Sequence, residues 1–305
     1  MPELPEVENL RRGLQKVLRG RRIRRVTVNK PKLVSGKGNN RTASTKKAAE
    51  FARRLTGDTV AGVERRAKNL IFRMRSGAVV VAHLKMSGQF AYKPPVARVG
   101  RAGVKSTVIG GHPIELSEHE LPNKHTHIIF NLDRGVLYYN DTRMFGYVLW
   151  YPNYEAAHSA HFEELGVEPF GPAFTLKYFH GALAKSGAKL KAVLLGQSIV
   201  NGLGNIYVDE ACFAAGIRPD RRANTITISE AGKLHAEIKR ILRRAIAAGG
   251  SSISTYRLLD MTRGNYAREH KVYGRSGQSC LKCGRPLSKM LIQSRTTVFC
   301  KNCQK

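Results

Sequence analysis

The chain has 305 residues, which is enough for two modest domains with hydrophobic cores. It contains 52 lysines and arginines against 22 aspartates and glutamates, a net charge of +30, while 42% of its residues are hydrophobic. These values exclude a disordered tail and indicate a folded protein whose basic surface binds a polyanion. Nucleic acid is the leading candidate, and an anionic membrane or ribosomal RNA would also satisfy the charge.

The chain begins Met1-Pro2-Glu3-Leu4-Pro5-Glu6. Removal of the initiator methionine would leave Pro2 with a free secondary amine, and an α-amino group titrates at about pH 8, so part of it is nucleophilic at neutral pH. The alternative interpretation is that a small second residue only permits removal of the methionine. The start has no apolar segment typical of a secretory signal, and no apolar run approaches the roughly 18 residues of a membrane span, so we expect a cytoplasmic protein.

The first half of the sequence is predicted to be β-rich. Apolar residues recur at spacings of three and four from Pro5 to about Arg19, which predicts a helix, and a second helix is expected near residues 43–55. Two pairs of short apolar runs flank glycine-containing turns, as in β-hairpins: residues 69–74 with 78–84, and 127–132 with 136–139. The apolar residues of segment 92–123 have no clear period, so we expect a long loop or an extra hairpin there.

The second half changes character at three prolines, Pro152, Pro169 and Pro172, where we place a linker. Four later segments have a helical pattern: residues 177–184, 189–195, 206–215 and 231–248. The predicted organisation is an N-terminal domain of residues 1–150, a linker of 151–175, a helical domain of 176–271 and a cysteine-bearing module of 272–305.

Four cysteines near the C-terminus are spaced as two Cys-x-x-Cys pairs, Cys280 with Cys283 and Cys300 with Cys303. Each pair presents two thiolates from one tight turn, so together they can close a tetrahedral Zn²⁺ site around a β-hairpin. Four thiolates leave no open position for a substrate, so this ion would be structural. The alternative of two disulfides or four idle thiols is disfavoured because the chain has no secretion signal.

Two regions of the second half are candidates for phosphate contacts. In Gly202–Glu210, a glycine turn precedes a helix that opens at Asn205, and free backbone N–H groups at such a position bind phosphate. An asparagine at a helix start is, however, more often a plain cap. The hairpin between the cysteine pairs carries Lys289, Arg295 and Lys301 and is expected to present cations to phosphate.

Further candidates lie beside the predicted strands of the first half. Lys68 precedes one strand, and His83 and Met86 follow another; in the ordinary case such a lysine is solvated and such a methionine belongs to a core. An exposed Phe145 beside Arg143 would be unusual in a core. Apolar and guanidinium wedges of this kind can enter a duplex and replace an extruded base.

Together these motifs resemble the formamidopyrimidine-DNA glycosylase / endonuclease VIII family, and the start is most similar to the formamidopyrimidine-DNA glycosylase branch. The resemblance runs from residue 2 to residue 303 and includes Lys124-His125-Thr126-His127, Tyr139-Asn140-Asp141-Thr142-Arg143 and Val272-Tyr273-Gly274-Arg275. It implies an α+β fold of two domains. One is an N-terminal β-sandwich with flanking helices, and the other is a helical domain with a helix–two-turn–helix motif and a C-terminal zinc-finger β-hairpin. It also implies a monomer that binds damaged double-stranded DNA.

The family implies a bifunctional enzyme of base excision repair, which excises oxidised purines such as 8-oxoguanine and formamidopyrimidines and then nicks the abasic strand. Carried over by position, Pro2 is the nucleophile, whose amine attacks the anomeric carbon and forms a Schiff base from which β- and δ-elimination follow. Glu3 is the general acid that protonates the sugar ring oxygen. Lys68 contacts the phosphate near the lesion and helps the elimination, and Arg295 grips a backbone phosphate.

The resemblance also implies further contacts with DNA. His83 and Asn205 hold phosphates that flank the flipped nucleotide. The residues that fill the gap left in the duplex are Met86, Arg143 and Phe145, with Arg143 facing the orphaned cytosine. Residues 254–266 lie where the family has a loop that covers the flipped purine.

Three positions depart from the family pattern, in which glycine is common: Ala67 before Lys68, Lys85 before Met86, and Ser294 before Arg295. Each adds a side chain near the DNA face, and we expect them to tune geometry and charge without removing a catalytic group. Residues 96–121 are an insertion without a family counterpart. The high positive charge predicts tight nonspecific binding with a steep salt dependence.

Two alternatives stay open. An endonuclease VIII-type relative would prefer oxidised pyrimidines, although that branch more often has glycine where this chain has Leu4. A noncatalytic zinc-bearing nucleic-acid-binding protein, such as a ribosome-associated factor, would explain the charge and the zinc. It would leave Pro2, Glu3 and Lys68 unexplained.

Overall fold

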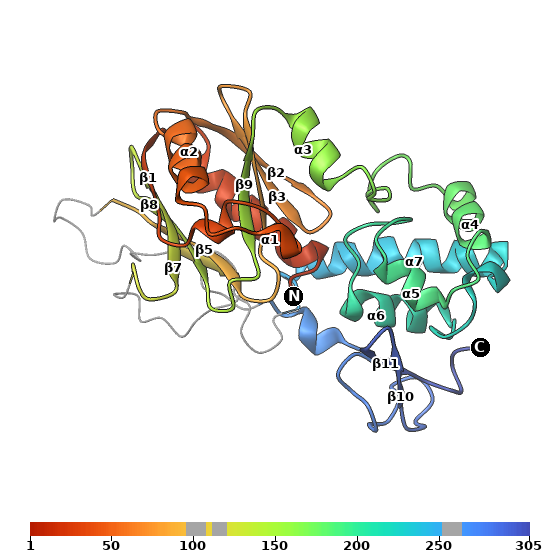
Figure 1. The fold of residues 1–305 in the computed structure, drawn as a ribbon. Coiled ribbons are helices and arrows are strands. Elements are labelled where there is room, and N and C mark those ends of the chain that lie inside the picture. The colour runs from red at the N-terminus through yellow and green to blue at the C-terminus, as the bar shows by residue number, and fades with distance from the viewer. Residues whose placement is uncertain (96–107, 112–120, 252–263) are drawn as a thin grey trace. The chain divides into compact units, whose positions relative to one another are not determined.

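The structure is a computed structural model that describes residues 1–95, 108–111, 121–251 and 264–305. The described residues form two compact units (Figure 1). The first contains Met1–Pro2, Glu6–Phe162 and the described ends of Ser251–Gly264. The second contains Glu3–Pro5, Glu163–Gly250 and Asn265–Lys305. The division therefore passes between Pro2 and Glu3, so that the first residues of the chain contribute to both units.

The first unit is the predicted β-sandwich, built from two antiparallel sheets. One sheet has the order β2-β3-β4-β9, with bounds Val60–Arg66, Asn69–Met74, Val79–His83 and Tyr147–Tyr151. The other has the order β1-β7-β8-β5-β6, with bounds Ile23–Val28, Thr126–Leu132, Val136–Asp141, Gly88–Lys93 and Val108–Gly111. Phe72 of β3 and Phe90 of β5 pack edge to face, with ring centroids 5.5 Å apart, and so join the two sheets in one core.

Two helices flank the sandwich because their apolar residues recur on one face. In α1, Leu4–Leu18, these residues lie three or four apart and are buried in the sandwich core: Val7, Leu10, Leu14 and Leu18. Helix α2, Thr45–Leu55, begins where the Ser44 side chain accepts a hydrogen bond from the Lys47 amide. The remaining helical elements of this unit are η1 at Pro31–Leu33, η2 at Gly38–Asn40 and α3 at Tyr154–His161.

The second unit is helical. Its helices are α4, Leu176–Ala184; α5, Leu190–Leu195; α6, Asn205–Ala215; and α7, Ile228–Ala247, with short helices η3 at Ala223–Thr225 and η4 at Tyr266–Glu269. A capping box starts α7, since the Thr227 and Glu230 side chains each accept the backbone N–H of the other residue. The chain ends in the predicted hairpin, β10 at Ser288–Ile292 and β11 at Arg295–Phe299.

The structure adds elements that the sequence pattern did not predict. The segment expected to be a long loop or an extra hairpin, 92–123, contains the end of β5 and all of β6, which pair antiparallel as the hairpin alternative requires, and the range expected to be a linker contains α3. Strand β1 escaped detection because a bulge between Ile23 and Arg25 breaks its alternation, so that two consecutive arginines are exposed. Among the described residues, no helix is long and apolar enough to span a bilayer.

Candidate nucleic-acid interface and metal centre

The start of the chain lies close to Lys68 and His83 in the first unit. Pro2 is buried, whereas 43% of the Met1 surface is exposed. Burial holds the pKa of His83 well below its usual value, and the charges of Lys85, Lys68 and the amino terminus lower it further. The imidazole is therefore neutral at physiological pH, and the structure brings Pro2, Lys68 and His83 into one region.

Glu3 lies in the second unit, at the N-terminus of α6. The residue before this helix is Gly204, which has no side chain to cap it. Instead, Glu3 Oε1 accepts the Ile206 N–H at 3.0 Å and Oε2 accepts the Tyr207 N–H at 3.4 Å. A Cβ atom at Gly204 would lie 2.4 Å from Glu3 Cδ, so a glycine is required for the carboxylate to occupy this place.

Asn205 and Arg295 are brought together where strand β11 meets α6. Asn205 Nδ2 donates to the carbonyl of Thr296, the residue after Arg295, at 3.0 Å. Lys191 Nζ donates to the same carbonyl at 3.2 Å. Arg295 itself is exposed at the start of β11. Two predicted phosphate contacts thus lie side by side on secondary structure rather than on separate loops.

A buried ion pair that the sequence did not predict supports this junction. Lys191 Nζ lies 2.6 Å from Asp209 Oδ1, and both side chains are fully buried. The other oxygen, Oδ2, accepts the Val298 N–H of β11 at 3.1 Å. Burial raises the pKa of Asp209 to about 6, and Lys191 opposes that rise. The pair fixes α5, α6 and β11 relative to one another.

Met86, Arg143 and Phe145 form an exposed group in the first unit. The Met86 and Phe145 side chains are 40% and 49% exposed, and the Arg143 guanidinium lies 4.7 Å from the centroid of the Phe145 ring. Arg41 donates to the backbone carbonyls of Met144 and Phe145, at 2.8 and 2.5 Å. Large apolar side chains are thus held in water by a braced loop, which is the arrangement a wedge for duplex DNA requires.

Asp141 organises the two loops that carry this group. Its buried carboxylate accepts hydrogen bonds from the Ser87 hydroxyl at 2.5 Å, the Arg143 amide at 3.2 Å and the Gly146 amide at 2.7 Å. Ser87 follows Met86, so one side chain connects both loops. The role of Asp141 is not visible in the sequence, because its partners come from two separate segments.

Four left-handed residues other than glycine adjoin predicted DNA contacts. Their φ angles are 53° at Ala67, 50° at Lys85, 52° at Met144 and 56° at Ser294. They precede Lys68, Met86, Phe145 and Arg295, respectively. Among the described residues, Gln197 and Gln293 share this conformation. Strained backbone of this kind persists where the surrounding structure holds it, and it clusters at binding sites.

Glu210 connects α6 to the backbone that leads into the cysteine module. Its carboxylate accepts the N–H groups of three successive residues, Lys271, Val272 and Tyr273, at 2.8 to 3.0 Å. Sequence reasoning missed this role because the partners lie 61 or more positions away. Asp209 holds strand β11 against α6, and the next residue, Glu210, holds the backbone of residues 271–273 against the same helix.

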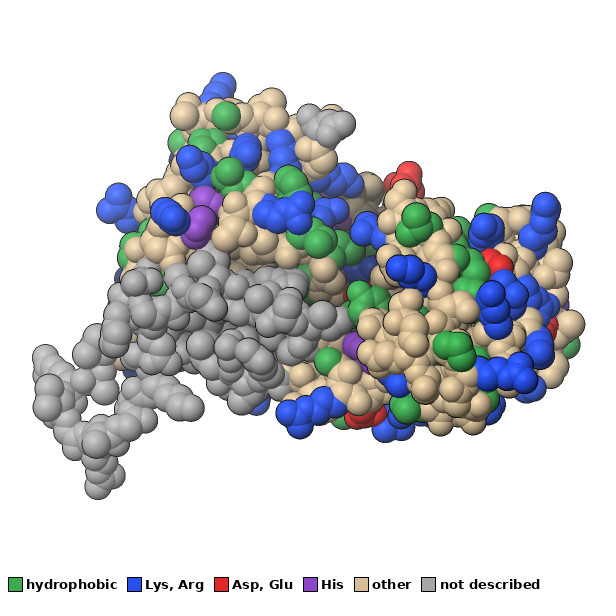
Figure 2. All heavy atoms as spheres, turned by 90° about the horizontal axis from the view of Figure 1, so that it is seen from below, with side chains coloured by type: hydrophobic (Ala, Val, Ile, Leu, Met, Phe, Trp, Pro, Cys, Tyr) green, Lys and Arg blue, Asp and Glu red, His purple; other side chains and the backbone are tan. Residues whose placement is uncertain are grey.

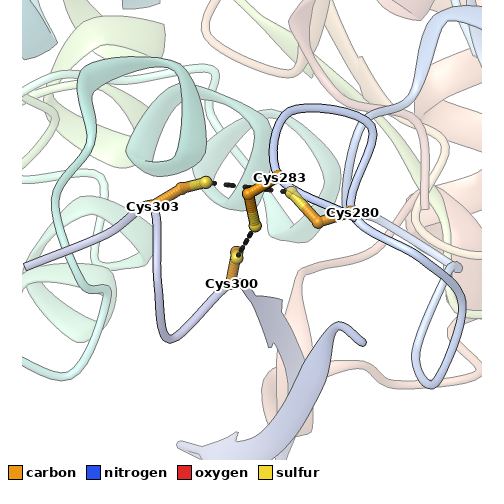
Figure 3. Close-up of side chains that lie close together, drawn as sticks. All are labelled: Cys280, Cys283, Cys300 and Cys303. Carbon is orange, nitrogen blue, oxygen red and sulfur yellow. Dashed lines mark hydrogen bonds between the residues drawn. The ribbon is translucent and has the colours of Figure 1, made fainter. Parts of the chain in front are cut away.

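The four cysteines converge on one point (Figure 3). Their sulfurs all lie within 4.8 Å of one another, with Cys280 Sγ 3.9 Å from Cys303 Sγ and Cys283 Sγ 3.5 Å from Cys300 Sγ. Tetrahedral coordination with Zn–S bonds of about 2.3 Å needs sulfurs about 3.8 Å apart. None of the four is in a disulfide. The cluster therefore fits a metal ion, and the two printed sulfur separations are too long for disulfide bonds.

The predicted base-covering loop, residues 254–266, and the insertion, residues 96–121, lie mainly outside the described residues. Glu6 holds the chain just before the former, since its Oε1 accepts the Ser251 N–H at 2.7 Å. The surface is basic, as the composition indicates. On the face shown in Figure 2, lysine and arginine side chains are spread over the described residues, and acidic side chains are sparse.

Comparison with known proteins agrees with this geometry. The family model of the formamidopyrimidine-DNA glycosylase N-terminal domain matches residues 1–148, and that of the formamidopyrimidine-DNA glycosylase H2TH domain matches residues 165–257. The formamidopyrimidine-DNA glycosylase of Bacillus subtilis is 37% identical over 305 residues, covering 100% of this chain and 99% of the relative. The Listeria monocytogenes enzyme of the same name is 36% identical, with both chains covered completely.

Solved structures of the Lactococcus lactis protein Fpg have the same fold. Its complex with DNA containing an abasic site matches with a TM-score of 0.81 and 33% identity, covering 99% of each chain. A variant in complex with Fapy-dG-containing DNA matches with a TM-score of 0.82 and 34% identity, covering 100% of each chain. The present chain belongs to the formamidopyrimidine-DNA glycosylase family.

Proposed function

We propose that the protein is a bifunctional DNA glycosylase and abasic-site lyase that excises oxidised purines from double-stranded DNA. The observation that carries the proposal is the chain start, where Pro2 is buried and His83 responds to both the amino terminus and Lys68. Burial is the main reason that the pKa of His83 is low, and the charges of Lys68 and the terminus lower it further. The names of full-length relatives support the substrate class. The Lactococcus lactis complexes with abasic-site and Fapy-dG DNA support the DNA partner.

The proposed reaction starts when Met1 has been removed. The Pro2 nitrogen forms a bond to the anomeric carbon as the glycosidic bond to the base breaks, and the proton that the amine then loses is taken up by the departing base. Glu3 donates a proton to the sugar ring oxygen as the ring opens, which leaves an iminium between Pro2 and the sugar. The iminium acidifies the neighbouring carbon, so loss of its proton breaks the bond to the 3′ phosphate oxygen. A second elimination breaks the bond on the 5′ side.

The other predicted residues hold the DNA. Lys68, His83, Asn205 and Arg295 would contact phosphates around the flipped nucleotide. Met86, Arg143 and Phe145 would occupy the space that it leaves. The strained backbone beside Lys68, Met86, Phe145 and Arg295 supports these assignments.

The metal would be Zn²⁺, held by Cys280, Cys283, Cys300 and Cys303. The donor set consists of soft thiolates alone, which suits zinc, and four protein ligands fill a tetrahedral site. Such an ion supplies folding energy to the hairpin and has no position for substrate. Its function would be to keep Arg295 on a rigid strand.

The decisive experiment uses protein verified by mass spectrometry to lack Met1, incubated with a duplex containing 8-oxoguanine opposite cytosine in the presence of borohydride. We expect a covalent protein–DNA adduct, because borohydride reduces the iminium, and we expect Pro2→Gly to form none or far less. A retained Met1 should abolish the adduct while leaving DNA binding largely intact.

The proposal would be contradicted if processed wild-type protein formed no adduct and did not cleave the strand. A parallel duplex with an oxidised pyrimidine distinguishes the branch of the family. Faster excision of the pyrimidine would assign the protein to the endonuclease VIII type. Binding without any chemistry on either duplex would favour a noncatalytic role.

A further inference from the structure

Three side chains form a row across the four-stranded sheet at the end that carries Lys68. Leu70 of β3 lies opposite Ala82 of β4, and His83 of β4 lies opposite Tyr147 of β9. Antiparallel pairing therefore puts Asn69, His83 and Tyr147 at the same level on three neighbouring strands, on one face of the sheet. Tyr147 thus lies beside His83, which is predicted to hold a phosphate. It also lies beside Asn69, which follows the predicted phosphate contact Lys68.

Tyr147 contacts both of the other members of the row. Its ring packs against the His83 imidazole, with centroids 5.7 Å apart, and its hydroxyl donates to Asn69 Oδ1 at 3.1 Å. Asn69 Nδ2 in turn donates to the Arg66 carbonyl at 3.4 Å. Arg66 and Asn69 are the last pair of the β2–β3 hairpin, and only Ala67 and Lys68 lie between them. The phenol therefore holds, through Asn69, both ends of the turn that presents Lys68.

His161 and Tyr151 extend this contact into the protein. The His161 ring from α3 stacks on the Tyr147 ring, with centroids 5.4 Å apart, and its Nδ1 lies 3.4 Å from the Tyr147 hydroxyl. His161 Nε2 lies 2.7 Å from the Tyr151 hydroxyl. Burial lowers the pKa of His161 to about 4 and raises that of Tyr151 to about 12, so the imidazole is neutral and this phenol is protonated.

Because the Tyr147 hydroxyl donates to Asn69 and a neutral imidazole carries a single N–H, these hydrogen bonds run in one direction. Tyr151 donates to His161 Nε2, the N–H at Nδ1 of His161 donates to the Tyr147 oxygen, and Tyr147 donates to Asn69. Each donor in this series of hydrogen bonds has one acceptor. The last acceptor is Asn69, which follows Lys68 in the sequence. The four side chains form what we name the Tyr147 chain: Tyr151, His161, Tyr147 and Asn69.

The turn that receives this support is strained. Ala67 has a φ of 53°, in the left-handed region where a side chain is unfavourable. Two-residue hairpin loops that need positive φ at their first residue favour glycine there. The Arg65 guanidinium braces the turn from the other side by donating to the Ala67 carbonyl at 2.8 Å. Without the Tyr147 chain, one brace of a strained loop would be lost.

We propose that Tyr147 is a positioning residue that acts through Asn69 to hold Lys68 in place against the phosphate at the lesion. The inference rests on the proposed function, because it gives Lys68 the role of a phosphate contact in strand cleavage. It assigns to Tyr147 no contact with the DNA itself.

The test is Tyr147→Phe, which removes the hydroxyl and keeps the ring that packs on His83 and His161. The measurement is single-turnover cleavage of a duplex with a preformed abasic site. We expect cleavage to slow about tenfold, the effect of one lost hydrogen bond expressed as a rate. The matched control is Tyr138→Phe, which removes a hydroxyl from β8 of the other sheet and should stay within about twofold of wild type.

A double-mutant cycle with Lys68→Ala separates positioning from general loosening. If Tyr147 acts through Lys68, the slowing caused by Tyr147→Phe disappears when Lys68 is already absent. Equal slowing in both backgrounds, or wild-type cleavage by Tyr147→Phe, would overturn the proposal. If Tyr147→Phe does not fold, Asn69→Ala breaks the same chain at its last member, and the same outcomes apply.

Failure of the underlying function gives a different result. If borohydride traps no adduct of the wild-type protein, the proposed lyase activity itself is refuted. Cleavage by Lys68→Ala at the wild-type rate would remove the assigned role of Lys68, and the proposal for Tyr147 with it. If Lys68→Ala cleaves slowly and Tyr147→Phe cleaves at the wild-type rate, only the positioning role of Tyr147 is refuted.

Discussion

Ser294 shows how a single residue departs from what its backbone position favours. It follows Gln293 in the two-residue loop between β10 and β11, and both have positive φ angles, of 47° and 56°. A loop with two such angles is a type I′ turn, for which Asn-Gly is the preferred sequence. The left-handed angles at Ala67, Lys85 and Ser294 are ones that glycine adopts without steric cost.

Ser294→Gly is therefore expected to stabilise the protein, because glycine adopts this angle without steric cost. We expect a gain of about 0.5 to 1 kcal/mol, since relief of the left-handed penalty exceeds the added freedom of the unfolded chain. Thermal unfolding of the zinc-loaded protein measures the effect.

The matched control is Ser288→Gly, the same chemical change in the extended strand β10. It should lower stability, because glycine in a strand costs conformational entropy. Equal destabilisation by both changes would show that the loop is not strained at Ser294.

At the scale of elements, α6 depends on a residue far away in the sequence. Its N-terminal N–H groups are satisfied by Glu3, 203 positions before Ile206, and the glycine before the helix leaves room for that carboxylate. The helix start and the predicted general acid therefore fix each other. A side chain at Gly204 would compete directly for the place of the acid.

Gly204→Ala should impair excision by about 100-fold, because a shift of about 1 Å in a catalytic group can have an effect of this size. The new Cβ would lie 2.4 Å from Glu3 Cδ, so the carboxylate must move. Single-turnover excision of 8-oxoguanine from a duplex measures this step.

Gly181→Ala in α4 is the control, because a Cβ there meets no heavy atom within 4 Å. It should leave excision unchanged and stabilise the helix by about 1 kcal/mol. Excision at the wild-type rate by Gly204→Ala would show that the position of Glu3 does not limit the reaction.

The sequence predicted the elements whose signals are local, together with the cysteine cluster. The 69–74 and 78–84 hairpin was correct because both strands are continuous apolar runs around a glycine turn. The cysteine cluster was correct because its spacing is itself the signal. Strand β1 was missed because its bulge exposes two arginines. The roles of Tyr147 and Glu210 could not be predicted because their partners lie 78 and 61 or more positions away.

At the scale of the whole molecule, we expect the net charge of +30 to be the main determinant of nonspecific binding to DNA. Each cation that neutralises a phosphate releases a counterion, so affinity falls as salt rises. We expect affinity for an undamaged duplex to fall roughly 1,000-fold between about 50 and about 200 mM salt, as measured by fluorescence anisotropy.

Pro2→Gly is the control for this measurement, because it removes the proposed nucleophile and no cation. Its salt dependence should match that of the wild type. A nearly flat dependence in the wild-type protein would show that most of the basic side chains do not face DNA.

Helix α6 also determines how metal supply would influence the chemistry. Its first turn holds Glu3, while Asp209 and Glu210 hold β11 and the backbone at Lys271–Tyr273, which leads into the cysteine cluster. Loss of the ion would free that backbone and weaken the packing on which the helix depends. A cell short of zinc would then contain protein that still binds DNA through its charge but holds its acid poorly. We therefore expect the proposed excision activity to decline with metal supply, because loss of the ion would reach Glu3 through α6.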